Sequence, residues 1–209
     1  MSAVHRQKIL VLFAHPSQER SEVNVPIFNS LKQKEFVTLV DLYAEYPSFR
    51  IDIDREQERL VEHDVIVFMF PMYWYSTPSI LKEWQDLVLE YGFAYGTDGK
   101  ALHGKTFCCV LSAGGPKEAY KVDGYNHFTL RELLRPLEQT SNLTGMIYLP
   151  PLALYSARSV SESSERLLNH QKEIEKYFKC LHHGQLDYEK VKDLDCLNEV
   201  PLHEIMEKS

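Results

Sequence analysis

The fold is decided by one stretch of the chain, Val65-Ile66-Val67-Phe68-Met69-Phe70-Pro71-Met72-Tyr73-Trp74-Tyr75. Its first six residues are apolar, and a short unbroken apolar run predicts a strand that is buried on both faces of a sheet. After Ser76-Thr77-Pro78, apolar residues recur at helical spacing, at Ile80, Leu81, Trp84, Leu87 and Val88. The aromatic residues 72–75 are therefore expected at the carboxyl end of a strand, where open parallel sheets bind ligands. They either wall a flat, conjugated ligand or simply cap the core.

Four further apolar runs predict the other strands of the same sheet: Ile9–Ala14, Phe36–Asp41, Lys105–Ser112 and Leu143–Leu149. Helices are expected from Ser21 or Glu22, from Asp54, over Thr129–Gln139 with a bend at Pro136, and from Ser161 to about Lys179, whereas Leu42–Ile53 is expected to be a loop. Alternating strands and helices are typical of a doubly wound α/β fold. We therefore predict a five-stranded parallel sheet in the order 2-1-3-4-5, with helices on both faces.

Composition restricts the partners and the compartment. The net charge of −7 argues against nucleic acid and against adsorption on an anionic membrane. No apolar stretch is long enough to span a bilayer, and the N-terminus lacks a signal-peptide cleavage site. The four cysteines form no CxxC motif, and the adjacent pair Cys108-Cys109 would point to opposite faces of a strand. We therefore expect buried thiols in a reduced cytoplasm and no metal site.

We expect one domain over residues 1–183, since 209 residues with 44% hydrophobic content allow one well-buried core. Residues 184–209 are polar and irregular in sequence. They are expected to form a strap over the domain or to be partly disordered.

The predicted strand order brings three loops to one edge of the sheet: residues 15–24, 71–77 and 112–116, called here the first loop, the aromatic loop and the glycine loop. The first loop contains no dinucleotide or P-loop motif, but Ser21 and Asn24 at a helix N-terminus, with His15 nearby, would suit a phosphate monoester. The alternatives are that Ser21 is only an N-cap and that His15 is an ordinary loop histidine. Gly114 and Gly115 would let the backbone approach a ligand, or form a plain turn. Together the three loops suit flavin mononucleotide (FMN).

The motifs also resemble a known family. They are Ala14-His15-Pro16 with Ser21 and Asn24, then 70–78 with Leu81-Lys82-Glu83-Trp84 and Asp86, then Gly92-Phe93-Ala94-Tyr95-Gly96. This pattern is similar to that of the flavodoxin-like NAD(P)H:quinone reductases. The stretch 41–57, with Asp41-Leu42-Tyr43-Ala44-Glu45-Tyr46-Pro47, looks most like the ancillary subunits of glutathione-gated potassium-efflux (Kef) systems. The resemblance covers roughly residues 8–180.

The resemblance implies a set of site residues. FMN would be held by His15, Ser21, Glu22, Val23, Asn24, Met72, Tyr73, Trp74, Tyr75, Ser112, Ala113, Gly114 and Gly115. NADH or NADPH would be the co-substrate and a quinone the acceptor. The catalytic candidates are Tyr120, which matches the family's tyrosine, and His127, which lies one residue beyond the family's histidine; Asn126 is in register with that histidine. The family also implies a homodimer, for which Tyr91, Phe93 and Tyr95 are candidate interface residues.

Three functions remain open at this point. The first is a two-electron reductase with ping-pong kinetics. The second is a regulatory subunit of a Kef-type potassium antiporter, cytoplasmic or peripheral at the inner membrane through that partner. The third is a one-electron flavodoxin carrier. Lys117, Lys121, Arg131 and Arg158 would reach a 2′-phosphate or be ordinary surface charges, so the sequence does not separate NADH from NADPH.

Overall fold

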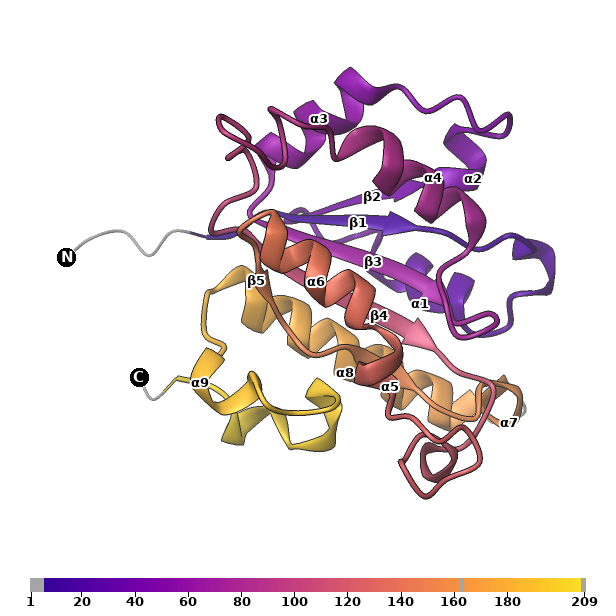
Figure 1. The fold of residues 1–209 in the computed structure, drawn as a ribbon. Coiled ribbons are helices and arrows are strands. Elements are labelled where there is room, and N and C mark those ends of the chain that lie inside the picture. Colours follow the sequence, from indigo (N-terminus) through magenta and orange to yellow (C-terminus); the bar gives the residue numbers. More distant parts are fainter. Residues whose placement is uncertain (1–5, 162–163, 208–209) are drawn as a thin grey trace.

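A computed structural model describes residues 6–161 and 164–207. One parallel sheet runs through the molecule (Figure 1). Its order is β2-β1-β3-β4-β5, and a further strand, β6, also pairs with β4. The strands are β1 (Ile9–Phe13), β2 (Val37–Asp41), β3 (Val65–Pro71), β4 (Thr106–Ser112), β5 (Ile147–Tyr148) and β6 (Leu152–Leu154). The predicted order 2-1-3-4-5 is confirmed.

Helices cover both faces of the sheet. The α-helices are α1 (Asn24–Leu31), α2 (Leu42–Glu45), α3 (Ile53–Glu62), α4 (Ser79–Val88), α5 (Leu130–Leu133), α6 (Arg135–Leu143), α7 (Ala157–Ser161), α8 (Ser164–His182) and α9 (Tyr188–Val191). Short 3-10 helices lie at η1 (Gln18–Arg20), η2 (Lys117–Ala119), η3 (Leu197–Glu199) and η4 (Leu202–Glu204). In the part of the chain described here, no helix combines the length and hydrophobicity needed to cross a membrane.

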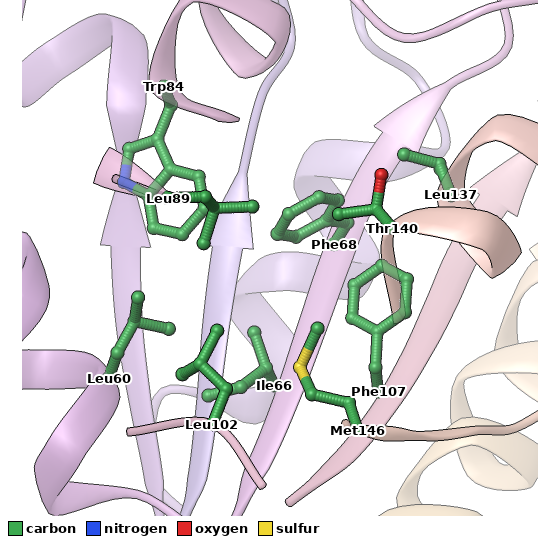
Figure 2. A pocket seen from close by; sticks show the side chains of 10 residues that line it. All are labelled: Leu60, Ile66, Phe68, Trp84, Leu89, Leu102, Phe107, Leu137, Thr140 and Met146. Atoms are coloured by element: carbon green, nitrogen blue, oxygen red, sulfur yellow. The ribbon is translucent and has the colours of Figure 1, made fainter. Parts of the chain in front are cut away.

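The continuous apolar run of β3 supplies two cores, because successive strand residues face opposite sides. Val65, Val67 and Met69 pack on the side of α1 and α8. Ile66, Phe68 and Phe70 pack on the side of α3, α4 and α6. The second core contains a small apolar cavity of only about 10 Å³ (Figure 2). A space of that size holds at most one water molecule, and its apolar lining offers that water almost no partner.

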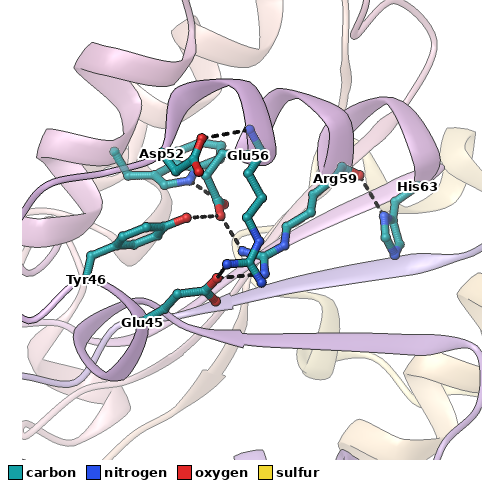
Figure 3. Close-up of polar contacts among 8 residues, drawn as sticks. Glu45, Tyr46, Asp52, Glu56, Arg59 and His63 are labelled. Carbon is teal, nitrogen blue, oxygen red and sulfur yellow. Dashed lines mark hydrogen bonds and ion pairs between the residues drawn. The ribbon is translucent and has the colours of Figure 1, made fainter.

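A buried carboxylate joins α3 to α4 and to the residue that follows α2 (Figure 3). Glu56 is fully buried and accepts hydrogen bonds from Tyr46 Oη at 2.7 Å, from Trp84 Nε1 at 2.8 Å and from the Arg59 guanidinium. Arg59 in turn pairs with Glu45 at 2.8 Å. Because each partner is satisfied, this charged cluster holds three segments together without leaving an unpaired buried ion.

Several element boundaries differ from the prediction. α1 begins at Asn24, two or three residues later than expected, because η1 and a bend occupy the preceding loop. The predicted loop 42–53 contains α2, whose first turn is capped by the Asp41 carboxylate. The predicted helix 129–139 is two helices, since the first ends at Leu133 and Pro136 lies in the first turn of the second, which begins at Arg135.

The fifth strand was predicted too long, and a sixth was missed. Leu143 is the last residue of α6, and β5 contains only Ile147 and Tyr148. Pro150 and Pro151 lack the N–H group that continued pairing needs. The chain resumes pairing with β4 after them, as β6. Two short strands therefore replace the single longer strand.

The C-terminal residues described here pack on the edge of the sheet as a strap. The Asn198 side chain accepts from Ala153 N–H at 3.1 Å and donates to Ala153 C=O at 2.9 Å. Arg131 donates to the carbonyls of Lys192 and Leu194, and Cys196 is fully buried. Because the amide of Asn198 occupies the exposed hydrogen-bonding groups of β6, this edge is not open to another strand at that residue.

Candidate functional site

The three predicted loops meet at the carboxyl ends of β1, β3 and β4, as proposed from the sequence. They line two adjoining cavities, of about 470 Å³ and about 750 Å³. Met72, Tyr73, Gly114 and Arg158 line both, so the two spaces share one wall. We call the smaller one the first-loop cavity and the larger one the aromatic cavity.

The structure brings together nearly all of the predicted site residues. The first-loop cavity is lined by His15, Ser21, Glu22, Val23, Asn24, Met72, Tyr73, Ser112 and Gly114, and the aromatic cavity adds Trp74, Tyr75, Gly115 and Tyr120. Ala113 lines neither, because its side chain is buried and its backbone pairs with Leu154 and Ala157. His127 also lines neither; it is exposed, with a left-handed backbone at φ 60°.

The first loop presents polar donors at the start of α1. Ser21 Oγ accepts the N–H of Val25 at 3.1 Å, so Ser21 partly satisfies the helix N-terminus although the formal N-cap residue is Val23. The first N–H groups of a helix have no partner within the helix, and they carry the positive end of its dipole. Arg20 adds a guanidinium to the same cavity. This end of the site therefore suits an anion such as a phosphate.

His15 is a second donor in the first-loop cavity. Its side chain is buried, and Nδ1 accepts the N–H of Ser17 at 3.2 Å. The neutral ring therefore carries its proton on Nε2. Burial lowers the pKa of His15 below its ordinary value, while Glu19 and Asp41 oppose that shift. The ring is thus kept neutral near pH 7.

The glycine loop is tied to the other two loops. Asn24 Nδ2 donates to Ser112 Oγ at 2.8 Å, and both side chains are buried. The N–H of Met72 donates to the carbonyl of Ser112 at 2.9 Å. A Cβ built on Gly114 would meet no atom within 4 Å. The backbone of Gly114 therefore faces open space within the cavities, as a close approach to a ligand requires.

The aromatic loop turns sharply in a strained conformation. Tyr73 and Ser76 form an isolated antiparallel bridge, and the two residues between them, Trp74 and Tyr75, have φ values of 50° and 62°. Such values cost about 1–2 kcal/mol for a residue with a bulky side chain. The turn leaves Trp74 93% exposed beside the aromatic cavity. Strain of this kind concentrates at functional sites.

Tyr120 lies on the far wall of the aromatic cavity. Its side chain is 9% exposed, and its ring packs against that of Tyr155 at 5.6 Å. Burial raises the pKa of Tyr120, and the neighbouring Gly115 backbone and Asn126 side chain oppose that rise. The phenol is therefore protonated near pH 7.

Sequence reasoning missed part of the lining. Ala157 and Arg158 line the first-loop cavity from α7, which follows β6, a strand that the apolar pattern did not predict. Arg158 was considered from the sequence only as a partner for a nucleotide 2′-phosphate or as a surface charge. Tyr125 and Asn126 line the aromatic cavity from the loop between η2 and α5. The sequence did point to position 126, because the histidine of the family falls in register with Asn126. The four cysteines are buried as expected, and burial raises the pKa of each thiol.

This chain is similar in sequence and structure to several known proteins. The potassium-efflux ancillary protein KefG of Cronobacter sakazakii is 45% identical over 170 residues, which cover 81% of this chain and 91% of that protein. The crystal structure of general stress protein 14 of Treponema denticola in complex with FMN is 33% identical, with a TM-score of 0.79, and covers 83% of this chain and 99% of that one. The crystal structure of an NADPH-quinone reductase from P. pentosaceus is also 33% identical, with a TM-score of 0.69, and covers 79% and 96%.

A family model described as the flavodoxin-like fold matches residues 7–178, which span β1 to most of α8. The chain belongs to this flavodoxin-like family.

Proposed function

We propose that this chain is an FMN-dependent NAD(P)H:quinone oxidoreductase that moves two electrons as a hydride. The observation that carries the proposal is the pair of adjoining cavities, one with phosphate-binding chemistry and one with an aromatic wall. The FMN complex of the Treponema denticola structure and the name of the P. pentosaceus enzyme support it.

The residues present fit FMN. The Nε2–H of His15, the Ser21 hydroxyl and the start of α1 would hold the phosphate and ribityl chain, together with Glu22, Val23 and Asn24. Residues Met72–Tyr75 and Ser112–Gly115 would hold the ring, because Gly114 leaves room for close approach. When bound, FMN supplies the redox chemistry by accepting a hydride from NAD(P)H and passing two electrons to a quinone.

The chain itself would orient the second substrate and manage its proton. Tyr73, Trp74 and Tyr75 offer π faces on which a nicotinamide or a quinone ring stacks. The Tyr120 hydroxyl is protonated and lines that cavity, so it would donate a hydrogen bond to the developing oxyanion of the acceptor. His127 follows the lining residue Asn126 and would act from the rim. One cavity for both substrates would give ping-pong kinetics.

The test is a spectrum followed by an assay. The purified protein is expected to be yellow, to release FMN on heating, to have its flavin bleached by NADPH or NADH alone, and to oxidise the nucleotide over many turnovers only when a quinone is added. Initial velocities at several quinone concentrations should give parallel double-reciprocal lines. A protein that binds FMN but shows no quinone-dependent oxidation of either nucleotide would overturn the enzymatic proposal.

The relative named KefG favours a second role, on a Kef-type potassium antiporter. The chain would then be cytoplasmic and peripheral at the inner membrane through that partner. Co-purification with the antiporter, and potassium efflux that survives Tyr120→Phe, would separate this role from catalysis. Efflux that is the same with and without the protein would rule the role out.

We also propose a homodimer, for which Tyr91 and Tyr95 are exposed and Phe93 is half-buried. Light scattering at micromolar concentration should give twice the chain mass. The third function, a one-electron carrier, predicts a blue semiquinone during dithionite titration, whereas the two-electron reductase predicts none.

A further inference from the structure

Residues 116–126, called here the outer wall, form a large part of the lining of the aromatic cavity. The lining residues that they contribute are Pro116, Ala119, Tyr120, Tyr125 and Asn126. The backbone bonds of the outer wall are local; for example, the N–H of Asn126 donates to the carbonyl of Ala119 at 2.9 Å. A surface loop that is held by local bonds opens easily unless side chains tie it to the rest of the domain.

Side chains do tie the outer wall to other parts of the chain. Tyr75 Oη, from the aromatic loop, donates to Asn126 Oδ1 at 3.2 Å. Lys117 Nζ pairs with Glu199 Oε1 at 2.9 Å. Glu199 belongs to the strap, residues 185–207, which lies beyond the residues 7–178 that the family model matches. A segment outside the family's shared fold therefore contacts the lining of the candidate site.

The strap contacts both ends of the outer wall. Lys117 lies at the beginning of the wall, and its partner Glu199 is in η3. Arg131 lies in α5, just past the end of the wall, and donates to the carbonyl of Leu194 at 2.8 Å. Because Leu194 and Glu199 are close in sequence, one short stretch of the strap fixes the two ends of the loop relative to each other.

A third contact between the strap and the outer wall runs through Tyr155. The Tyr155 hydroxyl lies 3.2 Å from Cys196 Sγ, and its ring centroid lies 5.6 Å from that of Tyr120. Cys196 and Tyr120 are both buried. Close-packed side chains transmit displacement, so a shift of the strap at Cys196 would reach Tyr120 through the intervening ring.

The strap is itself fixed to the domain. Asn198 bonds to both backbone groups of Ala153 in β6, as described above. Leu197 is fully buried; its N–H donates to the carbonyl of Pro151 at 2.9 Å, and its carbonyl accepts from Tyr177 Oη of α8 at 2.7 Å. Figure 1 shows the strap in yellow beside α8. The strap can therefore hold the outer wall in a fixed position relative to the sheet.

We propose that Leu194, Cys196 and Glu199 are positioning residues that brace the outer wall and thereby set the shape in which the aromatic cavity receives a quinone. The inference rests on the proposed function for its substrate, but the bracing contacts do not depend on it. The described strap residues do not line the cavity, so they act through the wall. Lys117 and Glu199 are partly exposed, and such a pair changes an equilibrium by about two- to fivefold.

Hydrogen exchange of the full-length, flavin-free protein, measured by mass spectrometry, tests the brace. Glu199→Gln removes the charge but keeps an oxygen for the N–H of Cys196, which Glu199 accepts at 3.4 Å. Amides of the outer wall should exchange about two- to fivefold faster in this variant, whereas amides of β4 should keep their wild-type rates. Asp187→Asn is the matched control, because Asp187 pairs with Lys190 inside the strap at 3.4 Å. It should leave exchange of the wall unchanged.

The reversed pair is the rescue. Lys117→Glu combined with Glu199→Lys should bring exchange of the outer wall back toward the wild-type rate, because the attraction is restored with the charges exchanged. Wild-type exchange of the wall in Glu199→Gln would overturn the inference. Equal acceleration of the wall and of β4 would also overturn it, since that result reports a loss of global stability.

Kinetics of the flavin-loaded protein test the effect on the cavity. Glu199→Gln should raise KM for a quinone about two- to fivefold and leave kcat unchanged, because the wall contacts the substrate equally in the ground state and the transition state. A loss of folded protein would instead lower kcat and leave KM unchanged. Faster exchange of the wall with an unchanged KM would overturn the role in shaping the cavity. Faster exchange in a protein that reduces no quinone would leave the brace standing and remove the proposed function.

Discussion

The hydrogen bond between Asn24 and Ser112 gives the sharpest test of how the site is assembled. It joins the first loop to the glycine loop across 88 residues, at 2.8 Å, with both side chains buried. Ser112→Ala removes the acceptor and leaves the buried Asn24 amide unpaired. An unsatisfied buried polar group costs about 1–3 kcal/mol, so the free energy of unfolding of the flavin-free protein should fall by that amount.

The double-mutant cycle isolates the bond itself. Asn24→Ala should cost a similar amount, but the double variant should cost little more than either single one, because neither partner is then left unpaired. The expected coupling is about 1 kcal/mol or more. Ser30→Ala is the matched control: Ser30 is on the same helix, about 9 Å further along, and bonds to the carbonyl of Ile27. Its combination with Asn24→Ala should be additive.

Urea unfolding followed by circular dichroism measures all of these differences, provided that the slope with denaturant is the same for each variant. A change in slope would mean that the denatured state has changed. Additive effects of Asn24→Ala and Ser112→Ala, within about 0.5 kcal/mol, would refute the reasoning that this bond joins the two loops.

Four other outcomes are expected. Glu56→Ala should destabilise the protein by about 3–5 kcal/mol in urea unfolding, because it strands the Arg59 charge and the Trp84 N–H; a loss below 1 kcal/mol would contradict the role given to this carboxylate. Tyr148→Phe should leave stability unchanged or raise it by up to about 1 kcal/mol, because the Tyr148 hydroxyl is buried without a partner among the described residues; a loss of more than 1 kcal/mol would mean that the hydroxyl is satisfied. Folding lowers the pKa of His15 from 6.5, so the unfolded chain binds more protons, and the free energy of unfolding should fall as the pH drops below about 6.5. In the flavin-free protein, His15→Gln should lose less stability than wild type between pH 7 and pH 5. Equal losses in the two proteins would exclude the effect. Trp74→Gly should stabilise the flavin-free protein by about 1 kcal/mol, because it relieves a positive φ at an exposed side chain. The same variant should bind FMN more weakly in a fluorescence titration. Lower stability of the variant would show that the turn is not strained.

The sheet was predictable because each long strand is a continuous apolar run. Residues 9–13 and 65–70 are buried on both faces, and that burial is what makes their pattern unbroken rather than alternating. The sequence was less informative at the last strands. Ile147–Tyr148 and Leu152–Leu154 are too short to show a period, and the prolines between them break a pattern that was taken as one strand.

The candidate site was predictable in position but not in its internal bonds. Strand order alone brings His15, Trp74 and Gly114 to adjoining cavities, since the carboxyl ends of parallel strands share one edge. Arg158 was not placed there by that reasoning, because it follows the strand that was missed. The bonds Asn24–Ser112 and Tyr75–Asn126 span 88 and 51 residues and leave no local periodicity to detect.

The aromatic turn shows why local rules fail at this edge of the sheet. A two-residue connection with two positive φ values favours Asn-Gly, and the chain has Trp74-Tyr75 instead. The Tyr75 side chain has a use, since its hydroxyl reaches Asn126 beside Tyr120. Among the described residues, no hydrogen bond or ring contact of the Trp74 side chain matches that of Tyr75, and Trp74 is almost fully exposed. A residue that is both strained and exposed is typical of a ligand-binding site, which agrees with the place of Trp74 in the lining of the aromatic cavity.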